Sequence, residues 1–241
     1  MVGCLFPPRP PATMMEVMDT RSIAVVIAVK ELSAAKTRLS PGVDGNARRQ
    51  LVLAMLTDTL AAVRAAGLDQ VVVVSPDTSV AEAAQASGAR TVVDRGDVLN
   101  GDVLNAAFAI GIDHALLLWP GSRIMVLQAD LPAVRPESLT AAIDRSSDLE
   151  RAFIADHSGT GTTALFLNAA DLSAADTLRF GAHSAREHRR RGAVELTEDS
   201  GRWPDLRIDV DTVEDLLTAR RLGLGTSTSA VLESLQLDEQ T

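Results

Sequence analysis

Three basic side chains fall within nine residues and are the first candidates for chemistry. Lys30, Lys36 and Arg38 follow an apolar run at residues 22–29, and the two lysines are the only lysines in the chain. The segment contains no glycine, so it is neither a P-loop nor a dinucleotide fingerprint. Lysine and arginine can still hold a polyphosphate through charge-assisted hydrogen bonds. The segment is therefore predicted to bind phosphates, with a solvated basic turn as the alternative.

Acidic side chains stand at the ends of two further predicted strands. Asp130 follows the apolar pair Val126 and Leu127, and Asp209 and Asp211 flank a single valine. Residues two apart on a strand point to the same face, so Asp209 and Asp211 can face one ion together. Mg²⁺ prefers oxygen ligands, usually one or two carboxylates plus substrate phosphates. The three carboxylates are predicted to form a metal site if they meet in space, with local turn and helix caps as the alternative.

Two other segments could hold an anion without adding charge. Glycine and threonine alternate from Gly159 to Thr163, and Gly181 and Ser184 lie in a run that starts at Phe180. Backbone amides and hydroxyls in such loops can bind an oxyanion. Ser184 stands where the following helix is predicted to begin, and helix N-termini bind phosphate and carboxylate. The alternative for the Gly/Thr segment is an ordinary hairpin turn.

Other polar groups carry weaker signals. A basic cluster is expected on the solvated face of a helix. Its members are Arg186, His188, Arg189, Arg190 and Arg191. His114, His157 and His183 show no metal-ligand spacing and are expected to be structural or exposed. The single cysteine, Cys4, excludes an internal disulfide and a cysteine-based zinc site.

Strand and helix patterns alternate through the first two-thirds of the chain, which predicts a doubly wound α/β fold. Continuous β-branched runs are typical of strands buried in a parallel sheet. The predicted strands are residues 22–29, 70–75, 90–93, 123–129, 152–156, 162–167 and 206–210. The predicted helices are residues 47–66, 78–86, 103–117, 136–146, 182–190 and 213–222. In such a mostly parallel sheet with helices on both faces, ligands bind at the carboxyl ends of the strands.

Composition limits the class of protein. The 241 residues include 46% hydrophobic and 3% aromatic residues, and the formal net charge is -9. This charge argues against sequence-independent nucleic-acid binding but allows a small anion in a basic pocket. The chain has no apolar run of the roughly 18 residues needed to span a membrane and no signal-peptide pattern. We expect a cytoplasmic protein with one domain at residues 21–225, a disordered lead-in at 1–20 and a tail at 226–241.

The motifs occur in an order that resembles the CofC/FbiD group of guanylyltransferases. The matching runs are VKELSAAKTRL, VLQADLP, GTGTTAL, RFGAHS and DVDTVEDL, and the similarity extends from Ile23 to Gly225. The resemblance implies a MobA-like nucleotidyltransferase fold, which is GT-A-like. It also implies that GTP is coupled to phosphoenolpyruvate, giving enolpyruvyl-diphospho-5'-guanosine and pyrophosphate for coenzyme F-420 biosynthesis. The alternative acceptors are 2-phospho-L-lactate and 3-phosphoglycerate.

The resemblance further implies roles for individual residues. The residues that bind the GTP phosphates would be Lys30, Lys36 and Arg38, which together with Asp130 would be catalytic. The carboxylates for Mg²⁺, expected as two ions, would be Asp130, Asp209 and Asp211. The residues for phosphoenolpyruvate would be Thr162, Gly181 and Ser184. Asn105 would lie near the nucleotide base, and it is preferred to Asn100 in the repeated sequence GDVLN.

In the implied reaction, an oxygen of the acceptor phosphate attacks the α-phosphorus of GTP. This phosphate has a second pKa of about 6, so no strong general base is needed. Two other functions stay open. One is a molybdenum-cofactor or sugar nucleotidyltransferase, although the first loop of those enzymes is usually Gly-rich and no glycine occurs here between Ser22 and Gly42. The other is a catalytically silent nucleotide-binding module. The oligomeric state is also open, with a homodimer as one option.

Overall fold

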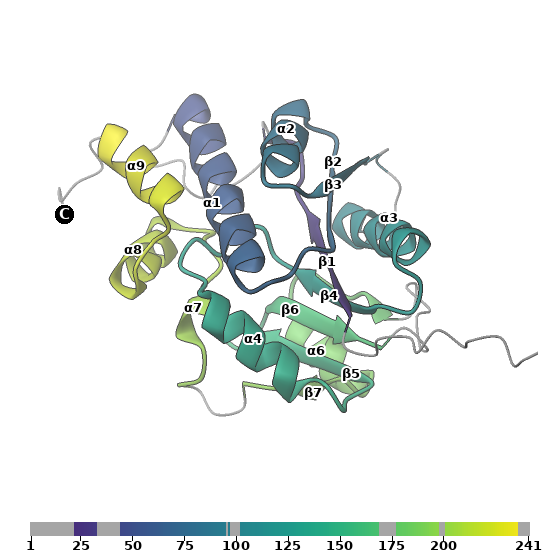
Figure 1. Ribbon diagram of the computed structural model, residues 1–241. Coiled ribbons are helices and arrows are strands. Elements are labelled where there is room, and N and C mark those ends of the chain that lie inside the picture. Colours follow the sequence, from purple (N-terminus) through teal and green to yellow (C-terminus); the bar gives the residue numbers. More distant parts are fainter. Residues whose placement is uncertain are drawn as a thin grey trace, which may run out of the picture.

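The computed structural model describes residues 22–32, 44–94, 96, 102–168, 177–197 and 201–235 (Figure 1). Its strands are β1 (Ile23–Ala28), β2 (Val71–Ser75), β3 (Arg90–Val93), β4 (Arg123–Leu127), β5 (Arg151–Ala155), β6 (Thr162–Leu167) and β7 (Val194–Glu195). Its helices are α1 (Gly45–Ala65), α2 (Thr78–Ala86), α3 (Val103–Leu118), α4 (Pro136–Arg145), α6 (Ser184–Arg190), α7 (Pro204–Arg207), α8 (Val213–Leu222) and α9 (Thr226–Ser234). None of the described helices has the length and apolar character needed to cross a membrane. Lys36, Arg38, Asn100 and the predicted lead-in at residues 1–20 lie outside the described residues.

Within the described residues, one seven-stranded sheet runs through the molecule in the order β3-β2-β1-β4-β6-β5-β7. Neighbouring strands are parallel except around β6, which runs antiparallel to both β4 and β5. The predicted doubly wound, mostly parallel sheet is therefore confirmed. Because β1 pairs with β2 on one side and with β4 on the other, the strand order reverses at β1. Such a reversal opens a crevice at the carboxyl ends of the strands.

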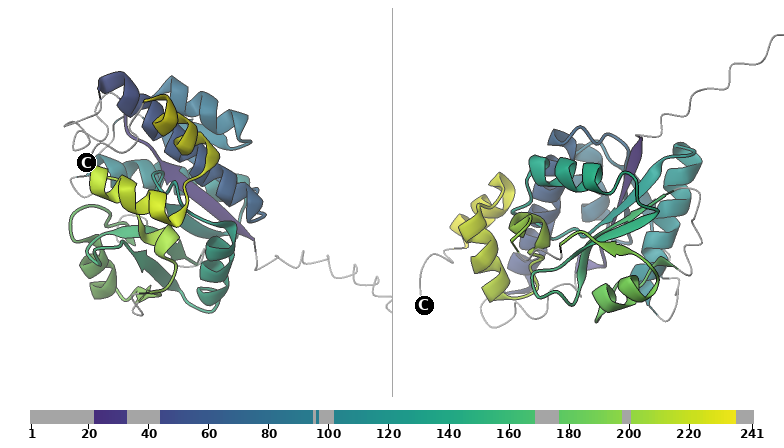
Figure 2. Two further views of the ribbon diagram at one scale, coloured as in Figure 1. Left: turned by 90° about the vertical axis from the view of Figure 1, so that its left-hand side faces the viewer. Right: turned by 90° about the horizontal axis from the view of Figure 1, so that it is seen from below.

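Alternate side chains of the central strands enter two separate cores. Val25 and Ile27 of β1 face the core formed with α1, α2 and α4, whereas Ala24 and Val26 face the core formed with α3 and α6. Helices therefore cover both faces of the sheet, as predicted (Figure 2). α3 packs closely because Gly111 lies against Val26, and a Cβ at Gly111 would stand 2.5 Å from the valine Cγ1.

The prediction of a strand at residues 206–210 is wrong. The chain there forms α7, which begins with Pro204, a favoured first helical residue. An extended stretch follows that is not one of the seven strands described. The buried Arg207 explains the difference, because its guanidinium donates to the carbonyl oxygens of Ala155 and Asp156 at 3.2 and 2.9 Å. These bonds tie α7 to the end of β5.

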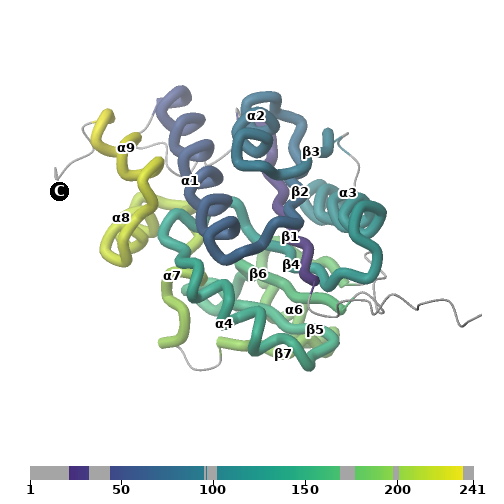
Figure 3. The backbone as a smooth tube through the Cα atoms, viewed as in Figure 1, coloured from purple at the N-terminus to yellow at the C-terminus, as the bar shows by residue number. Residues whose placement is uncertain are grey.

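The prediction of a tail from residue 226 is wrong for the residues of α9. This helix packs along α1, and Figure 3 shows the two side by side. Asp58 of α1 caps α9 from outside, because its carboxylate accepts the Ser227 and Thr228 N–H groups at 2.9 and 2.8 Å. Gly225 leaves room for this contact, since a Cβ at that position would overlap the Asp58 carboxylate. α9 is thus part of the folded body.

Candidate active site

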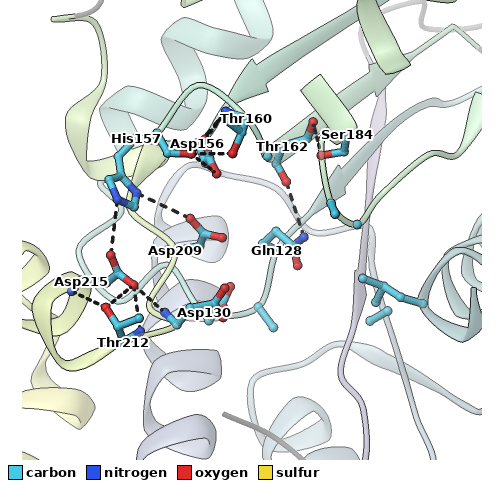
Figure 4. Close-up of a pocket in the computed structure, with 18 of the residues that line it drawn as sticks. Gln128, Asp130, Asp156, His157, Thr160, Thr162, Ser184, Asp209, Thr212 and Asp215 are labelled. Carbon is cyan, nitrogen blue, oxygen red and sulfur yellow. Dashed lines mark hydrogen bonds and ion pairs between the residues drawn. The ribbon is translucent and has the colours of Figure 1, made fainter. Parts of the chain in front are cut away.

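A cavity of about 740 Å³ opens at the carboxyl ends of β1 and β4, where the fold predicts a ligand. Its walls come from the ends of those strands, the turn between β5 and β6, the segment before α6, and residues 209–215 (Figure 4). Every predicted site residue that the structure describes lines this cavity, except Asn105. These residues are Lys30, Asp130, Thr162, Gly181, Ser184, Asp209 and Asp211.

Asp130 stands on a turn whose backbone is held from two sides. The buried Thr59 hydroxyl on α1 contacts the Ala129 carbonyl oxygen at 3.2 Å and accepts the Leu131 N–H at 3.3 Å. From the other side, the Val210 N–H donates to the Asp130 carbonyl oxygen at 3.1 Å. These bonds fix the turn and leave the Asp130 side chain on the wall of the cavity.

Asp209 and Asp211 line the cavity from the extended stretch after α7. The buried residues Ile208 and Val210 alternate with them, so the period of two expected from the sequence holds without a strand. Asp209 Oδ1 lies 4.0 Å from Nδ1 of His157, a half-exposed residue of the β5–β6 turn. The stretch therefore presents carboxylates to the cavity while its apolar side chains enter the core.

Asp215 is a further carboxylate in the same wall. Its Oδ2 accepts the N–H and the hydroxyl of Thr212, each at 2.8 Å, in a capping box that starts α8. Its Oδ1 lies 3.4 Å from His157 Nε2. In the described parts of the chain, no three carboxylate, histidine or cysteine side chains are grouped as a complete metal site. The carboxylates still suit Mg²⁺, which usually takes one or two of them together with substrate phosphates and water.

The polar groups of the Gly/Thr loop between β5 and β6 bind a carboxylate of the protein itself, that of Asp156. The Asp156 carboxylate accepts the Thr160 N–H and the Ser158 hydroxyl, each at 2.9 Å. Gly161 lies so close that a Cβ there would stand 2.5 Å from Asp156 Oδ2. The Thr160 amide is therefore engaged by the protein's own carboxylate, and the binding of a substrate oxyanion by this loop stays a prediction. The loop contributes to the cavity chiefly by placing Thr162, the first residue of β6.

Thr162 and Ser184 form a pair of hydroxyls in the cavity wall. The Ser184 hydroxyl donates to Thr162 Oγ1 at 3.0 Å, and both side chains appear together in Figure 4. The two residues are 4% and 1% exposed, so little of either faces bulk water. The Ala185 N–H donates to the Thr160 carbonyl oxygen at 3.1 Å, which joins α6 to the loop before β6. The pair offers polar contacts to an anion without adding charge.

The chain enters α6 through a turn with two left-handed residues, Gly181 with φ of 122° and His183 with φ of 60°. A side chain at Gly181 would be strained in this conformation. Asn105 holds the residue before the turn, since its amide donates to the Phe180 carbonyl at 2.9 Å and accepts the Phe180 N–H at 2.8 Å. Asn105 is buried and is not among the cavity-lining residues. It therefore positions the turn before α6, and its place near the nucleotide base stays a prediction.

Lys30 is an exposed side chain at the cavity wall, directly after β1. The Val29 N–H donates to the Val74 carbonyl oxygen at 2.9 Å, which fixes the end of the strand. The other two predicted cations, Lys36 and Arg38, lie outside the described residues. Lys30 thus stands where the sequence analysis expects it, and the three-cation cluster stays a prediction.

His188 is buried, so its expected place on a solvated helix face is wrong. The residue is 1% exposed, and its ring lies between those of Phe153 and Phe180, with centroid distances of 5.7 and 5.4 Å. Burial, with the charges of Arg179 and Arg191 nearby, lowers the pKa of His188 to about 4. The imidazole is therefore neutral at pH 7.

The cavity residues that the predicted site omits include Gln128, Asp156, His157 and Asp215. The sequence carries a signal for Asp215, because Thr212 and Asp215 have the spacing of a capping box at the start of a predicted helix. Gln128 lies two residues before Asp130, in the same motif, VLQADLP. Asp156 and His157 carry no such signal, since only the path of the β5–β6 turn brings them to the cavity.

Solved structures define the class of this fold. A protein of Desulfovibrio desulfuricans G20, assigned as a nucleotide-diphospho-sugar transferase, matches with a TM-score of 0.65 and 18% identity, covering 89% of this chain and 95% of its own. A Mycobacterium tuberculosis H37Rv protein solved in complex with manganese matches with a TM-score of 0.50 and 21% identity, covering 83% and 97%. Likeness at such identities concerns the fold alone. The fold is that of nucleotidyltransferases of the nucleotide-diphospho-sugar transferase type.

The family follows from sequence comparison. The family model described as guanylyl transferase CofC like matches residues 23–241. Phosphoenolpyruvate guanylyltransferase of Mycolicibacterium smegmatis is 45% identical over 209 residues, which cover 87% of this chain and 90% of that protein. The chain therefore belongs to the CofC-like guanylyl transferase family, which confirms the resemblance found in its motifs.

Proposed function

We propose that this protein is a guanylyltransferase that couples GTP to phosphoenolpyruvate and releases pyrophosphate. Family membership supports the class of reaction. The structural observation that carries the proposal is one cavity that combines Lys30, the carboxylates around Asp130 and the hydroxyl pair of Thr162 and Ser184. The product, enolpyruvyl-diphospho-5'-guanosine, serves coenzyme F-420 biosynthesis.

The reaction exchanges one phosphoanhydride bond for another. An oxygen of the acceptor phosphate attacks the α-phosphorus of GTP, and the bond from that phosphorus to the pyrophosphate breaks. The acceptor phosphate is mostly ionised at neutral pH because its second pKa is about 6, so the site needs no strong general base. The chief obstacle is repulsion between two polyanions. The protein must offset this repulsion and align the reacting groups.

We assign Asp130, Asp209 and Asp211 to the binding of Mg²⁺, with two ions as the expected number. Their oxygens have the chemistry that Mg²⁺ prefers, and all three line one cavity. The backbone bond from Val210 to Asp130 supports this assignment, because it ties together the two segments that carry the carboxylates. When bound, Mg²⁺ supplies positive charge that offsets the repulsion between phosphates.

The remaining residues divide between the two substrates. Lys30, with Lys36 and Arg38, binds the GTP phosphates and stabilises the charge that develops on the leaving pyrophosphate. Thr162 and Ser184 hold the phosphoenolpyruvate through hydroxyl contacts. Because Gly181 has no side chain, the backbone before α6 can lie close to this acceptor.

The test is pyrophosphate release from GTP and Mg²⁺ with each acceptor in turn. We expect release with phosphoenolpyruvate and none with 2-phospho-L-lactate or 3-phosphoglycerate. Release with 2-phospho-L-lactate alone would preserve the reaction and change the acceptor. The proposal fails if protein shown to be folded by circular dichroism releases no pyrophosphate with any of the three.

A further inference from the structure

Three buried side chains form a hydrogen-bonded series behind the proposed acceptor site. The Ser184 hydroxyl donates to Thr162 Oγ1 at 3.0 Å, and Thr162 Oγ1 lies 3.0 Å from Nδ1 of His188. Thr162 and Ser184 line the cavity, whereas His188 is not among the residues that line it. His188 is therefore linked to the site through the Thr162 hydroxyl.

The local structure explains why both partners reach the same hydroxyl. Ser184 and His188 are four residues apart on α6, so they lie on one side of the helix. That side faces the start of β6, where Thr162 stands. Threonine is branched at Cβ and has few favoured side-chain rotamers. Contacts from Ser184 and His188 together hold its hydroxyl in one of them.

The rest of the His188 environment is apolar. Phe153 and Phe180 flank the ring, and Nε2 is buried with no hydrogen-bond partner among the described residues. A buried polar atom without a partner costs about 1–3 kcal/mol, a penalty that a phenyl ring of similar size would avoid. What the imidazole adds over a purely packing residue is its bond to Thr162.

We propose that His188 is a positioning residue for the acceptor: its Nδ1–H and the Ser184 hydroxyl both donate to Thr162 Oγ1, which leaves the Thr162 O–H proton free to meet the acceptor phosphate. This inference rests on the proposed function, because it takes Thr162 and Ser184 as the acceptor-binding pair. His188 does not touch the substrate. Because it acts through Thr162, its loss should weaken the binding of the acceptor and not that of GTP.

The role is one of orientation and not of charge. The neutral imidazole adds no positive charge to the cavity, and the charges of Arg179 and Arg191 help to keep it neutral. Loss of His188 should therefore leave the ionic-strength dependence of acceptor binding as it is in the wild type. A charged ligand-binding residue would change that dependence when removed.

Two substitutions separate the hydrogen bond from the packing. His188→Phe keeps an aromatic ring and removes the bond, whereas His188→Asn offers an amide that can restore it. The readout is pyrophosphate release as a function of each substrate in turn. His188→Phe is expected to raise KM for phosphoenolpyruvate about tenfold, the effect of losing one hydrogen bond, and to leave KM for GTP within about twofold. His188→Asn should recover most of the loss.

Two controls test the route of the effect. Phe153→Leu disturbs the packing of the same ring without removing the bond, so it should lower stability and leave KM for phosphoenolpyruvate near the wild-type value. In a Thr162→Val background, His188→Phe should raise KM for phosphoenolpyruvate by less than about twofold, because its partner hydroxyl is already gone. A full tenfold effect in that background would show that His188 acts by another route.

The outcomes distinguish the inference from the proposed function. Wild-type protein that releases no pyrophosphate from GTP and phosphoenolpyruvate overturns the proposed function and the inference with it. Active wild-type protein with an unshifted KM for phosphoenolpyruvate in His188→Phe overturns the inference alone. The inference alone is also overturned if His188→Asn behaves like His188→Phe. It is overturned too if His188→Phe raises KM for GTP as much as KM for phosphoenolpyruvate.

Discussion

The backbone N–H of Val210 donates to the carbonyl oxygen of Asp130 at 3.1 Å, across a large separation in sequence. This bond joins the turn after β4 to the stretch that carries Asp209 and Asp211. The three carboxylates assigned to Mg²⁺ therefore belong to one frame and not to independent loops. The backbone segments that carry them are joined before any ion binds.

Replacing the Asp130 carboxylate should abolish most activity without unfolding the protein. Asp130→Asn preserves shape and removes the charge, so kcat/KM for guanylyl transfer should fall by about 100-fold or more. Pyrophosphate release at saturating Mg²⁺ measures the effect. Asp144→Asn, on the exposed side of α4, is the matched control and should retain full activity. Wild-type activity with normal Mg²⁺ dependence in Asp130→Asn would refute the metal assignment.

Thr59 should matter to catalysis although it lies on α1 behind the cavity. Thr59→Val removes the acceptor of the buried Leu131 N–H, which should cost about 1–3 kcal/mol of unfolding free energy and loosen the Asp130 turn. Denaturant unfolding and kcat measure the two effects. Thr59→Ser keeps the hydroxyl and should stay much closer to wild type in kcat. Equal loss of kcat in the serine variant would assign the effect to packing.

Acidification should destabilise the protein through His188. The pKa is about 4 in the folded state against an ordinary value of 6.5, so between these values the unfolded chain binds a proton that the folded chain does not. The unfolding free energy therefore falls as the pH drops from 6.5 to 4, by about 3 kcal/mol in full and about 2 kcal/mol at pH 5.

Chemical denaturation at pH 7 and pH 5 tests this linkage. The loss between the two values should be about 2 kcal/mol smaller in His188→Asn than in the wild type. Identical losses in the wild type and His188→Asn would mean that His188 titrates normally.

The contact between α1 and α9 should contribute measurably to stability. Asp58→Ala removes the external cap of α9, which should lower the unfolding free energy by about 1–2 kcal/mol. Hydrogen exchange should accelerate first in the amides of α9. Asp113→Ala, at an exposed position of α3, should show neither effect. Unchanged protection of α9 in Asp58→Ala would show that apolar packing alone holds the helix.

The regular parts of the fold could be predicted because their signals are local. Continuous β-branched runs such as Val71–Ser75 are typical of a buried strand, and the end of such a run places Asp130 at the ligand edge of the sheet. The same reasoning brought Lys30 and Thr162 to the cavity. The position of each of these residues depends on its own element.

The features that the sequence did not predict concern residues whose environment comes from distant segments. His188 lies among arginines in the sequence, and only the packing of α6 on Phe153 turns it inward. The Gly/Thr loop has the composition of an anion site, but the path of the chain places Asp156 inside it. Arg207, in the segment expected to be a strand, donates from α7 to the end of β5. The spacing of residues in the sequence does not predict any of these contacts.

The placement of α9 has a practical consequence for protein engineering. Asp58, which caps α9, is followed on α1 by Thr59, which holds the active-site turn. The Gly225 N–H also donates to the Pro132 carbonyl oxygen of that turn at 2.8 Å. A shortened version that ends before Thr226, or a bulky C-terminal fusion that displaces α9, would release both attachments at once. Expression designs should therefore keep α9 intact and place affinity tags upstream of β1.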